Sequence, residues 1–236
     1  MLSDLEIRYR TASNKCDVAK SSSFPPLQVL SITCWGANSW VSVIQNCATT
    51  LTSLKMSIGD VRPFGTVLRL AFPSLRHLSV SETSTASDIQ LQLDDPILQS
   101  VYKGLVTRKT PRVILQLSKA QYVTDLTLCR VPFELAPYPR LRTLCIQGGF
   151  TEMEADILSL PDAINHCPEL QSIRYRCLSW TYRILRPNDQ FKLLINEALK
   201  GTQRAISLEE FTPEAHHLPG SPLRKVCIRV PLSKAH

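Results

Sequence analysis

The chain has 236 residues, of which 44% are hydrophobic and 20% are charged, so it contains enough apolar material for a continuous core. This composition excludes a chain disordered throughout, and no apolar run approaches the roughly 18 residues that a membrane-spanning helix needs. The net charge is +7, but the basic residues are spread along the chain with one modest cluster at 107–112. That cluster is typical of a solvated face, because nucleic-acid binding usually requires a denser basic stripe.

A short pattern, L-x-x-L-x-L with other aliphatic residues replacing leucine, recurs along the chain. Its copies begin at Leu2, Leu27, Leu51, Leu75, Val123, Leu141, Leu170 and Leu223. The intervals from Leu2 to Leu75 are nearly equal, the next one, from Leu75 to Val123, is twice as long, and the later ones are irregular. Four successive copies at nearly constant phase exceed what an amphipathic chain shows by chance. A period of about 20–29 residues with this pattern is typical of leucine-rich repeats.

The repeat predicts an architecture. Each unit supplies one short strand with alternate residues pointing inward, and stacked units join these inward rows into a shared core. Successive strands then run parallel, so each connection crosses back on the opposite face. We expect a single leucine-rich-repeat domain over 1–236, an α/β solenoid of about seven to nine units with a curved parallel sheet on its concave side and helices or irregular segments on its convex side. Leu30, Leu54 and Leu78 should then align on adjacent strands.

The segments between the strands carry helix signals, in chain order. Residues 38–50 combine a capping residue with apolar positions at i, i+3, i+4 and i+7, which predicts a helix. Residues 94–106 open with Asp and an early Pro, which also favours a helix. Residues 152–167 begin with acids and contain Pro161, which should break or kink the helix. Residues 188–201 have one apolar face and a terminal glycine, and give the clearest helix prediction.

Two regions depart from the repeat. An irregular insertion is expected at about 82–122, and one strand should lie within 88–122. Both 89–93 and 113–117 alternate apolar and polar residues, so both are candidates for that strand. The part from 178 to 236 is less regular.

The stretch "INHCPELQSIRYRC" resembles the cysteine-containing leucine-rich repeat of F-box/leucine-rich-repeat proteins, in which Cys-Pro-x-Leu ends a helix and opens a strand. "IQNCATTLTSLKMS" is a looser copy, and "AFPSLRHLSVSET" and "PYPRLRTLCIQGG" resemble strands common in divergent fungal F-box-like proteins. The resemblance covers roughly 27–178 in scattered units. It implies a protein-recognition scaffold that binds the substrate of a ubiquitin ligase.

One part of the family pattern is missing from this chain. An F-box is a short helical domain that docks a Skp1-type adaptor, and no residues here match its helix. The resemblance therefore implies the recognition half alone, and a Skp1-type adaptor is an expected partner only if an F-box lies upstream.

Eight cysteines raise the question of disulfides or a metal site. The charged residues in the first ten positions do not form a secretory signal, and several cysteines adjoin apolar runs. We therefore interpret them as buried thiols of an intracellular protein, cytoplasmic or nuclear. No C-x-x-C pair occurs, and the acids and histidines of 209–217 are more typical of a solvated loop than of metal ligands.

The sequence also lacks the G-x-S-x-G nucleophile elbow and the glycine-rich phosphate loops. We expect no enzyme activity, no cofactor and no metal. A catalytic protein with an unrecognised site stays open as an alternative, which a pocket with converging titratable groups would support.

The remaining place for function is the strand face opposite the leucines, where the residues between them point outward. Our candidate partner-binding residues there are Lys55, His77, Arg174, Arg176, Lys225 and Arg229. The last four would form a basic stripe that receives an acidic segment of a protein partner, although ordinary solvated charge is an open alternative. A basic surface that binds RNA or another polyanion is the rival function. Trp35 and Trp180 follow strands and suit either binding anchors or filling between layers.

Overall fold

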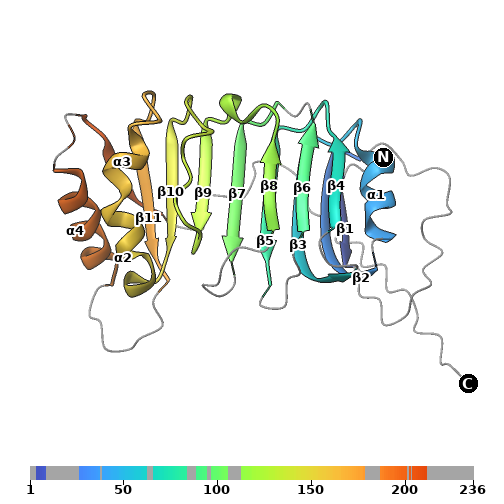
Figure 1. Cartoon of the computed structure of the whole chain (residues 1–236), viewed down its shortest axis with the longest axis horizontal. Helices are drawn as coiled ribbons and strands as arrows, with labels where there is room; N and C mark the ends of the chain where they lie inside the picture. Colours follow the sequence, from blue (N-terminus) through green and yellow to red (C-terminus); the bar gives the residue numbers. More distant parts are fainter. Residues whose placement is uncertain are drawn as a thin grey trace, which may run out of the picture. The chain divides into compact units, whose positions relative to one another are not determined.

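The computed structural model describes residues 4–8, 27–37, 39–62, 66–83, 89–94, 97–105, 113–178, 187–200, 202 and 204–211. They form an α/β protein in which every strand pairing established within this part of the chain is parallel (Figure 1). The chain divides into two compact units. The described residues of unit 1 lie up to Ile97 and between Thr110 and Lys119, and those of unit 2 lie between Leu98 and Lys109 and between Ala120 and Gly220. The single repeat domain over 1–236 stays a prediction.

Unit 1 contains four adjacent strands, in the order β1 (Asp4–Arg8), β2 (Val29–Ala37), β3 (Ser53–Arg62) and β5 (His77–Glu82). Leu30 lies opposite Leu54, which lies opposite Leu78, so the predicted alignment of these leucines is confirmed. All three leucines are buried. Each leucine by itself could be buried in many ways, but neighbours in register share one apolar row.

A second sheet of three strands completes unit 1: β4 (Thr66–Ala71), β6 (Ile89–Asp94) and β8 (Val113–Leu117). Figure 1 shows these strands in front of the first sheet of the unit. Alternate apolar residues of β4 and β6 are buried. Both strand candidates in the insertion, 89–93 and 113–117, are thus strands. They pair with each other as β6 and β8, and β6 also pairs with β4, a strand that the sequence patterns did not predict.

Unit 2 contains five adjacent strands, in the order β7 (Ser100–Leu105), β9 (Asp125–Cys129), β10 (Thr143–Gly148), β11 (Ser172–Cys177) and β12 (Ser207–Glu210). The prediction of a helix over 94–106 is wrong, because β7 occupies it. Leu98 and Val101 supply the first two apolar positions of a repeat that begins close to midway between Leu75 and Val123. Val101 is buried opposite Leu126, and pairing with β9 outweighs the helix-start signal. The double interval therefore conceals one repeat.

The helices agree with the other predictions. Unit 1 has α1 (Ser39–Cys47), and unit 2 has α2 (Phe150–Leu158), α3 (Leu160–Ile164) and α4 (Pro187–Leu199), besides a short 3-10 helix at Ala120–Tyr122. Pro161 stands in the first turn of α3, shortly after α2 ends, so the predicted break is confirmed. None of these described helices is long and apolar enough to cross a membrane.

Most cysteines of the described part are buried free thiols, as expected: Cys34, Cys47, Cys129, Cys145 and Cys167. Cys177 is half-buried, and Cys16 and Cys227 lie outside the described residues. Burial raises the pKa of the Cys167 thiol to about 11, with the nearby Arg204 acting in the opposite direction. Such thiols stay protonated near neutral pH and act as small apolar side chains.

Candidate recognition surface

The strands of unit 1 present small polar side chains on the face opposite their leucines. Burial alternates along β5, and the outward positions form rows across β2, β3 and β5. One row is Ser31, Lys55 and Ser79, and the next is Thr33, Ser57 and Ser81. Lys55 is exposed within the first row, and His77 is half-buried at the start of β5. The structure therefore places both predicted residues on this face, and Lys55 is the one charged residue among the two rows named here.

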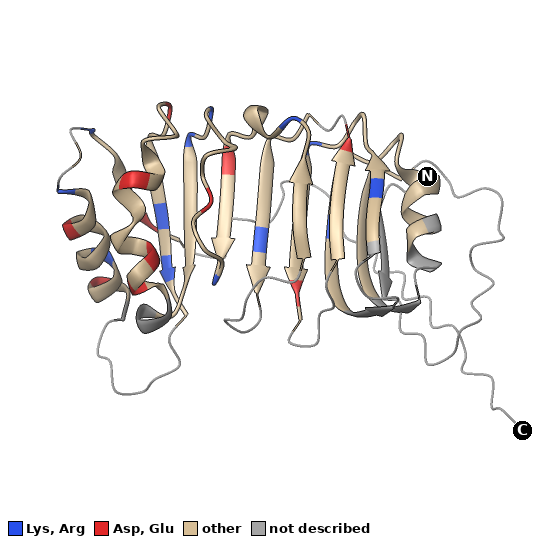
Figure 2. Cartoon of the chain, in the orientation of Figure 1, with Lys and Arg blue, Asp and Glu red and all other residues tan. Residues whose placement is uncertain are grey.

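The equivalent face of unit 2 has a different chemistry. The strand register forms one row from Tyr102, Thr127, Cys145, Arg174 and Glu209. A second row consists of Gly104, Cys129, Gln147 and Arg176. Aromatic, thiol and amide groups of these rows thus lie on β7, β9 and β10, and the basic residues of the rows lie on β11, where Figure 2 shows basic positions. We call these two rows the unit 2 face.

Tyr102 lies flat along its own strand. A methyl group added at Gly104 would stand 2.5 Å from the Tyr102 hydroxyl oxygen and 2.7 Å from Cε1, so the ring covers this glycine. Burial raises the pKa of the Tyr102 phenol above its usual value, and a hydrogen bond with the Cys129 thiol adds to the effect. The ring is consequently held in one place, with its hydroxyl uncharged.

The neighbouring thiols form the floor of the unit 2 face. Gln147 Nε2 donates a hydrogen bond to Cys145 Sγ at 3.6 Å. Burial raises the pKa of the Cys145 thiol, although hydrogen bonds from Gln147 and Thr127 and the charge of Arg174 act to lower it. Burial is the largest of these effects, so the thiol stays neutral and the floor carries no charge.

Arg174 is not a free cation. Its Nε lies 3.2 Å from Oε2 of Glu209, with 40% of the arginine side chain and 51% of the glutamate side chain exposed. Glu209 reaches this position because β12 pairs with β11, a strand that the sequence analysis did not anticipate in its less regular C-terminal part. The predicted basic stripe consequently has an acid beside it.

Arg176 has no ion pair or hydrogen bond within the part of the chain that the structure describes. Lys225 and Arg229, the other two members of the predicted stripe, lie outside the described residues, as does Trp180. Nothing is described of the Trp35 side chain. A partner-binding role for the stripe therefore stays a prediction. Its two described members differ, because Arg174 is paired with Glu209 and Arg176 has no ion pair with a described residue.

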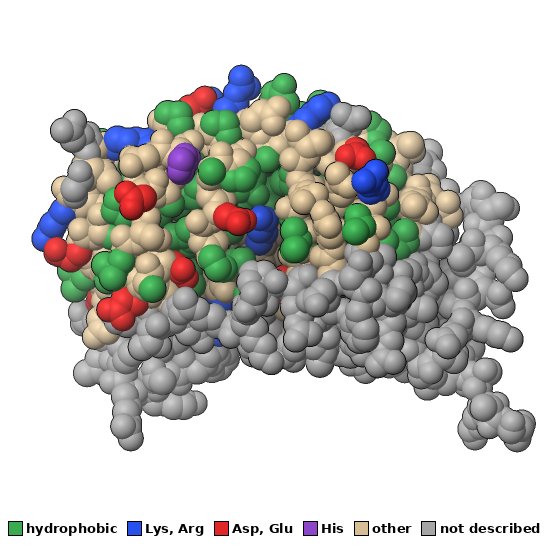
Figure 3. Space-filling view, in the orientation of Figure 1, with side chains coloured by type: hydrophobic (Ala, Val, Ile, Leu, Met, Phe, Trp, Pro, Cys, Tyr) green, Lys and Arg blue, Asp and Glu red, His purple; other side chains and the backbone are tan. Residues whose placement is uncertain are grey.

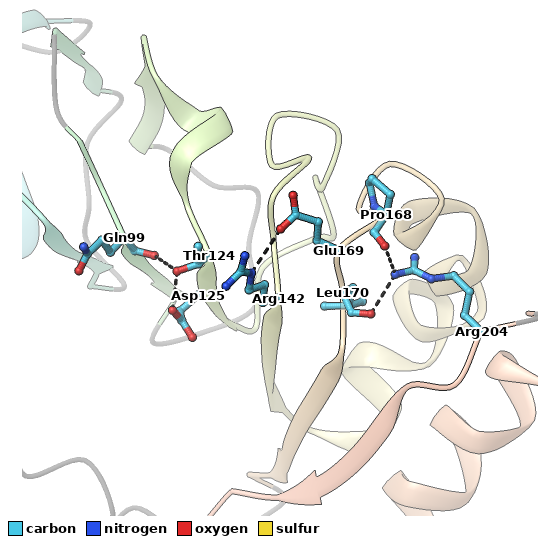
Figure 4. Close-up of polar contacts among 8 residues, drawn as sticks. All are labelled: Gln99, Thr124, Asp125, Arg142, Pro168, Glu169, Leu170 and Arg204. Carbon is cyan, nitrogen blue, oxygen red and sulfur yellow. Dashed lines mark hydrogen bonds and ion pairs between the residues drawn. The ribbon is translucent and has the colours of Figure 1, made fainter.

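Polar contacts fix the starts of the strands in unit 2 (Figure 4). The Thr124 hydroxyl donates to the carbonyl oxygen of Gln99 at 3.2 Å, and Arg142 Nε pairs with Glu169 Oε2 at 3.3 Å. The Arg204 guanidinium donates to four carbonyl oxygens at 2.8–3.2 Å, those of Ile164, Cys167, Pro168 and Leu170. Arg204 thereby holds the Cys-Pro turn between α3 and β11. The role of this turn is therefore structural, and the Cys167 thiol is buried beneath it.

The side of the molecule that carries β4, β6 and β8 shows no concentration of one kind of side chain among the described residues (Figure 3). Figure 3 shows hydrophobic and charged side chains interspersed over the side of β4, β6 and β8, with no single charge predominating among the described residues. No group of three or more metal-ligating side chains gathers in the described ranges either.

No protein-family model matches the chain, and neither a curated protein nor a solved structure is significantly similar to it.

Proposed function

We propose that the chain is a non-catalytic recognition scaffold, built as a leucine-rich-repeat solenoid. In this proposal it is the intracellular, substrate-binding portion of an F-box-like ubiquitin-ligase component. The observation that carries the proposal is the in-register parallel pairing of strands that recur at a nearly constant interval between Leu27 and Val123, including the strand after Leu98. Repeats of this kind use their leucines for the core and leave the opposite strand face for binding.

The character of that face also supports recognition of a protein. The unit 2 face combines a fixed tyrosine with arginine, the residue types that contribute most often to binding energy at protein interfaces. Its charges are few and of both signs, since Arg174 already pairs with Glu209. A surface for RNA or another polyanion would need more unpaired cations, and its binding would weaken steeply with salt.

Site-specific photo-crosslinking tests the proposal. A photoreactive amino acid replaces Ser79 or Thr127 on the outward strand faces, and matched variants carry it at Gln90 or Gln116 on the outward side of β6 and β8. We expect protein adducts from native cell extract at the first two positions and few at the second two. Adducts confined to the Gln90 and Gln116 variants would contradict a recognition role for the strand faces.

The ubiquitin-ligase part of the proposal needs its own measurement. The chain, in its natural full-length context, should co-purify with a Skp1-type adaptor, and a captured protein should be ubiquitinated only when the chain is present. Capture of a partner without either result would retain the scaffold and remove the ligase assignment.

A further inference from the structure

We propose that the unit 2 face binds an extended acidic peptide segment, which places a large apolar side chain on the Tyr102 ring and a carboxylate on Arg176. This inference rests on the proposed recognition function and specifies the partner of that same site. It differs from a general basic stripe because it assigns the acidic contact to Arg176 and excludes Arg174.

Tyr102 is suited to the apolar contact because its position is already determined. The ring lies over Gly104, where a side chain would leave no room for it. A partner that stacks on this ring therefore loses little freedom on the protein side, where ordering an interface side chain is otherwise a cost of binding. Cys129 and Cys145 lie beside it on the same two rows and are at most 8% exposed, so the contact with a partner is made mainly by the tyrosine ring.

Arg176 is suited to the carboxylate because no described residue forms an ion pair or a hydrogen bond with its side chain. The other members of its row, Gly104, Cys129 and Gln147, are uncharged. Glu209 lies in the neighbouring row and is engaged with Arg174. Asp125 lies one row further along the strands, at the beginning of β9, and its Oδ2 lies 2.8 Å from the Thr124 hydroxyl, whose one proton can point either to it or to the Gln99 carbonyl.

Among the described residues, Arg176 is therefore the one charged member of its row, and a cation in this place is complementary to an anionic group. A planar guanidinium also recognises a carboxylate through two parallel hydrogen bonds, which a lysine in this place would not provide.

The strand order sets the spacing of the two contacts. From β7 to β11 the sheet passes through β9 and β10, which makes three steps between strands. At about 4.8 Å for each step the two contacts lie about 14 Å apart. An extended peptide advances about 3.3 Å per residue, so the apolar residue and the acid should be about four residues apart.

The test uses fluorescein-labelled peptides of equal length, made of Gly and Ser with one Trp and one Glu. The separation of Trp and Glu varies from one position to seven, and a parallel set carries Lys in place of Glu. Binding to the full chain is measured by fluorescence anisotropy. The variants are Arg176→Glu, Arg176→Gln and Tyr102→Ala, and the matched control is Arg69→Glu, an exposed arginine on β4 that faces outward from the second sheet.

We expect the tightest binding at a separation of about three to five positions, a loss of about tenfold in Arg176→Glu with a shift toward the Lys peptides, and a similar loss in Tyr102→Ala. The Arg69→Glu control should bind like the unaltered chain. Gly104→Ala provides a second disturbance of the ring, and circular dichroism confirms folding of each variant.

The inference is overturned if the unaltered chain does not prefer Glu over Lys, or if Arg176→Glu keeps that preference. It is equally overturned if Arg69→Glu loses as much binding as Arg176→Glu. If the peptide experiment failed in this way, crosslinks at Ser79 and Thr127 would still support the recognition function. Failure of the peptide site can therefore be told apart from failure of the proposed function. Peptide binding without such crosslinks would locate the peptide site and remove the broader function.

Discussion

The two units of the chain build the same kind of parallel strand ladder but return the chain in different ways. In chain order α1 and β4 connect the ladder strands of unit 1, from β2 to β3 and from β3 to β5, whereas in unit 2 α2 and α3 connect β10 to β11 and α4 connects β11 to β12. The leucine pattern is shared, so it determines the strands that form the ladder. The return segments follow their own periodicity, which is strand-like alternation in "IQLQL" and helical in the segment at 187–199.

Their inward rows differ as well. At the last position of the repeat, unit 1 has Ile32, Met56 and Val80, which are all apolar and buried. The same row in unit 2 begins with Lys103 opposite Leu128. Lys103 Nζ lies 5.8 Å from the centre of the Tyr138 ring, and burial lowers its pKa while Glu134 acts against this. A charge in the row means that unit 2 gains less from burial than unit 1 at the equivalent position.

The largest expected effect comes from shortening the aligned leucines. Leu54→Ala in unit 1 and Leu144→Ala in unit 2 remove side chains that are at most 1% exposed, and each should lower the free energy of unfolding by about 2–5 kcal/mol. Urea unfolding followed by circular dichroism measures the loss, and the exposed Lys55→Ala serves as a control. If each variant shifts only part of the transition, the two units unfold separately; a uniform shift in both shows that they unfold together.

Arg204→Met should have the next largest effect, and it should be confined to unit 2. Four carbonyl oxygens lose their donor, and we expect a loss of about 2–3 kcal/mol, as for hydrogen bonds to a charged group. Hydrogen exchange should accelerate at residues 164–178 and stay unchanged at 53–58. Equal acceleration in both regions would show that the turn is not a local element of unit 2.

Lys103→Met should make the inward-facing row of unit 2 as apolar as that of unit 1. It should stabilise the protein by about 1 kcal/mol near neutral pH. Because the folded pKa of Lys103 lies below its unfolded value of 10.5, the folded protein releases this proton first, and the contribution of Lys103 to stability becomes more favourable as pH rises through that window. The advantage of the variant should shrink accordingly between neutral pH and about pH 10.5.

The measurement is the difference in unfolding free energy between the variant and the unaltered chain across this pH range. The difference is needed because the phenol of Tyr138, with its pKa raised to about 12, titrates with the opposite sign. An advantage that is constant with pH would show that Lys103 is charged alike in the folded and unfolded states.

The smallest effect is expected from a pair of matched hydroxyls. Thr52 Oγ1 donates to the carbonyl of Gln28 at 3.1 Å in unit 1, and Thr124 Oγ1 donates to that of Gln99 at 3.2 Å in unit 2. Thr52→Val and Thr124→Val should each cost about 0.5–1 kcal/mol, because both bonds are exposed and the Thr124 hydroxyl, although Asp125 lies near it as well, has one proton to donate. Thermal unfolding measures both. A cost well above this range in only one unit would mean that the two strand starts are not equivalent.

Most of the strands and helices could be predicted from the sequence. The prediction failed where a helix-start signal and a strand pattern occurred in the same segment. The strands of the repeat, the helices at α1 and α4 and the break before Pro161 followed from periodicity and local propensity. The strand β7 did not, because Lys103 replaces the third apolar residue of the repeat and an Asp-Pro pair suggests a helix start. A search that accepted two of the three apolar positions at the expected phase would have found Leu98 and Val101.

The candidate site was less predictable for a related reason. The sequence located Arg174 and Arg176 on one strand face, but it contained no signal that Glu209 would become the neighbour of Arg174. It also placed no weight on Tyr102, whose strand was mistaken for a helix. Which charge is paired depends on residues that are far apart in the chain, and local patterns do not carry that information.

The sequence by itself determined which residues are inward and which are outward, because the alternation of a strand and the period of a repeat are written in the order of apolar side chains. Only the tertiary structure decided which strands became neighbours, that β4, β6 and β8 form a sheet of their own, and that Glu209 neutralises Arg174 while Arg176 has no ion pair among the described residues. Pairing between distant segments is chosen by the total burial and hydrogen bonding of the folded chain, and no single segment specifies it.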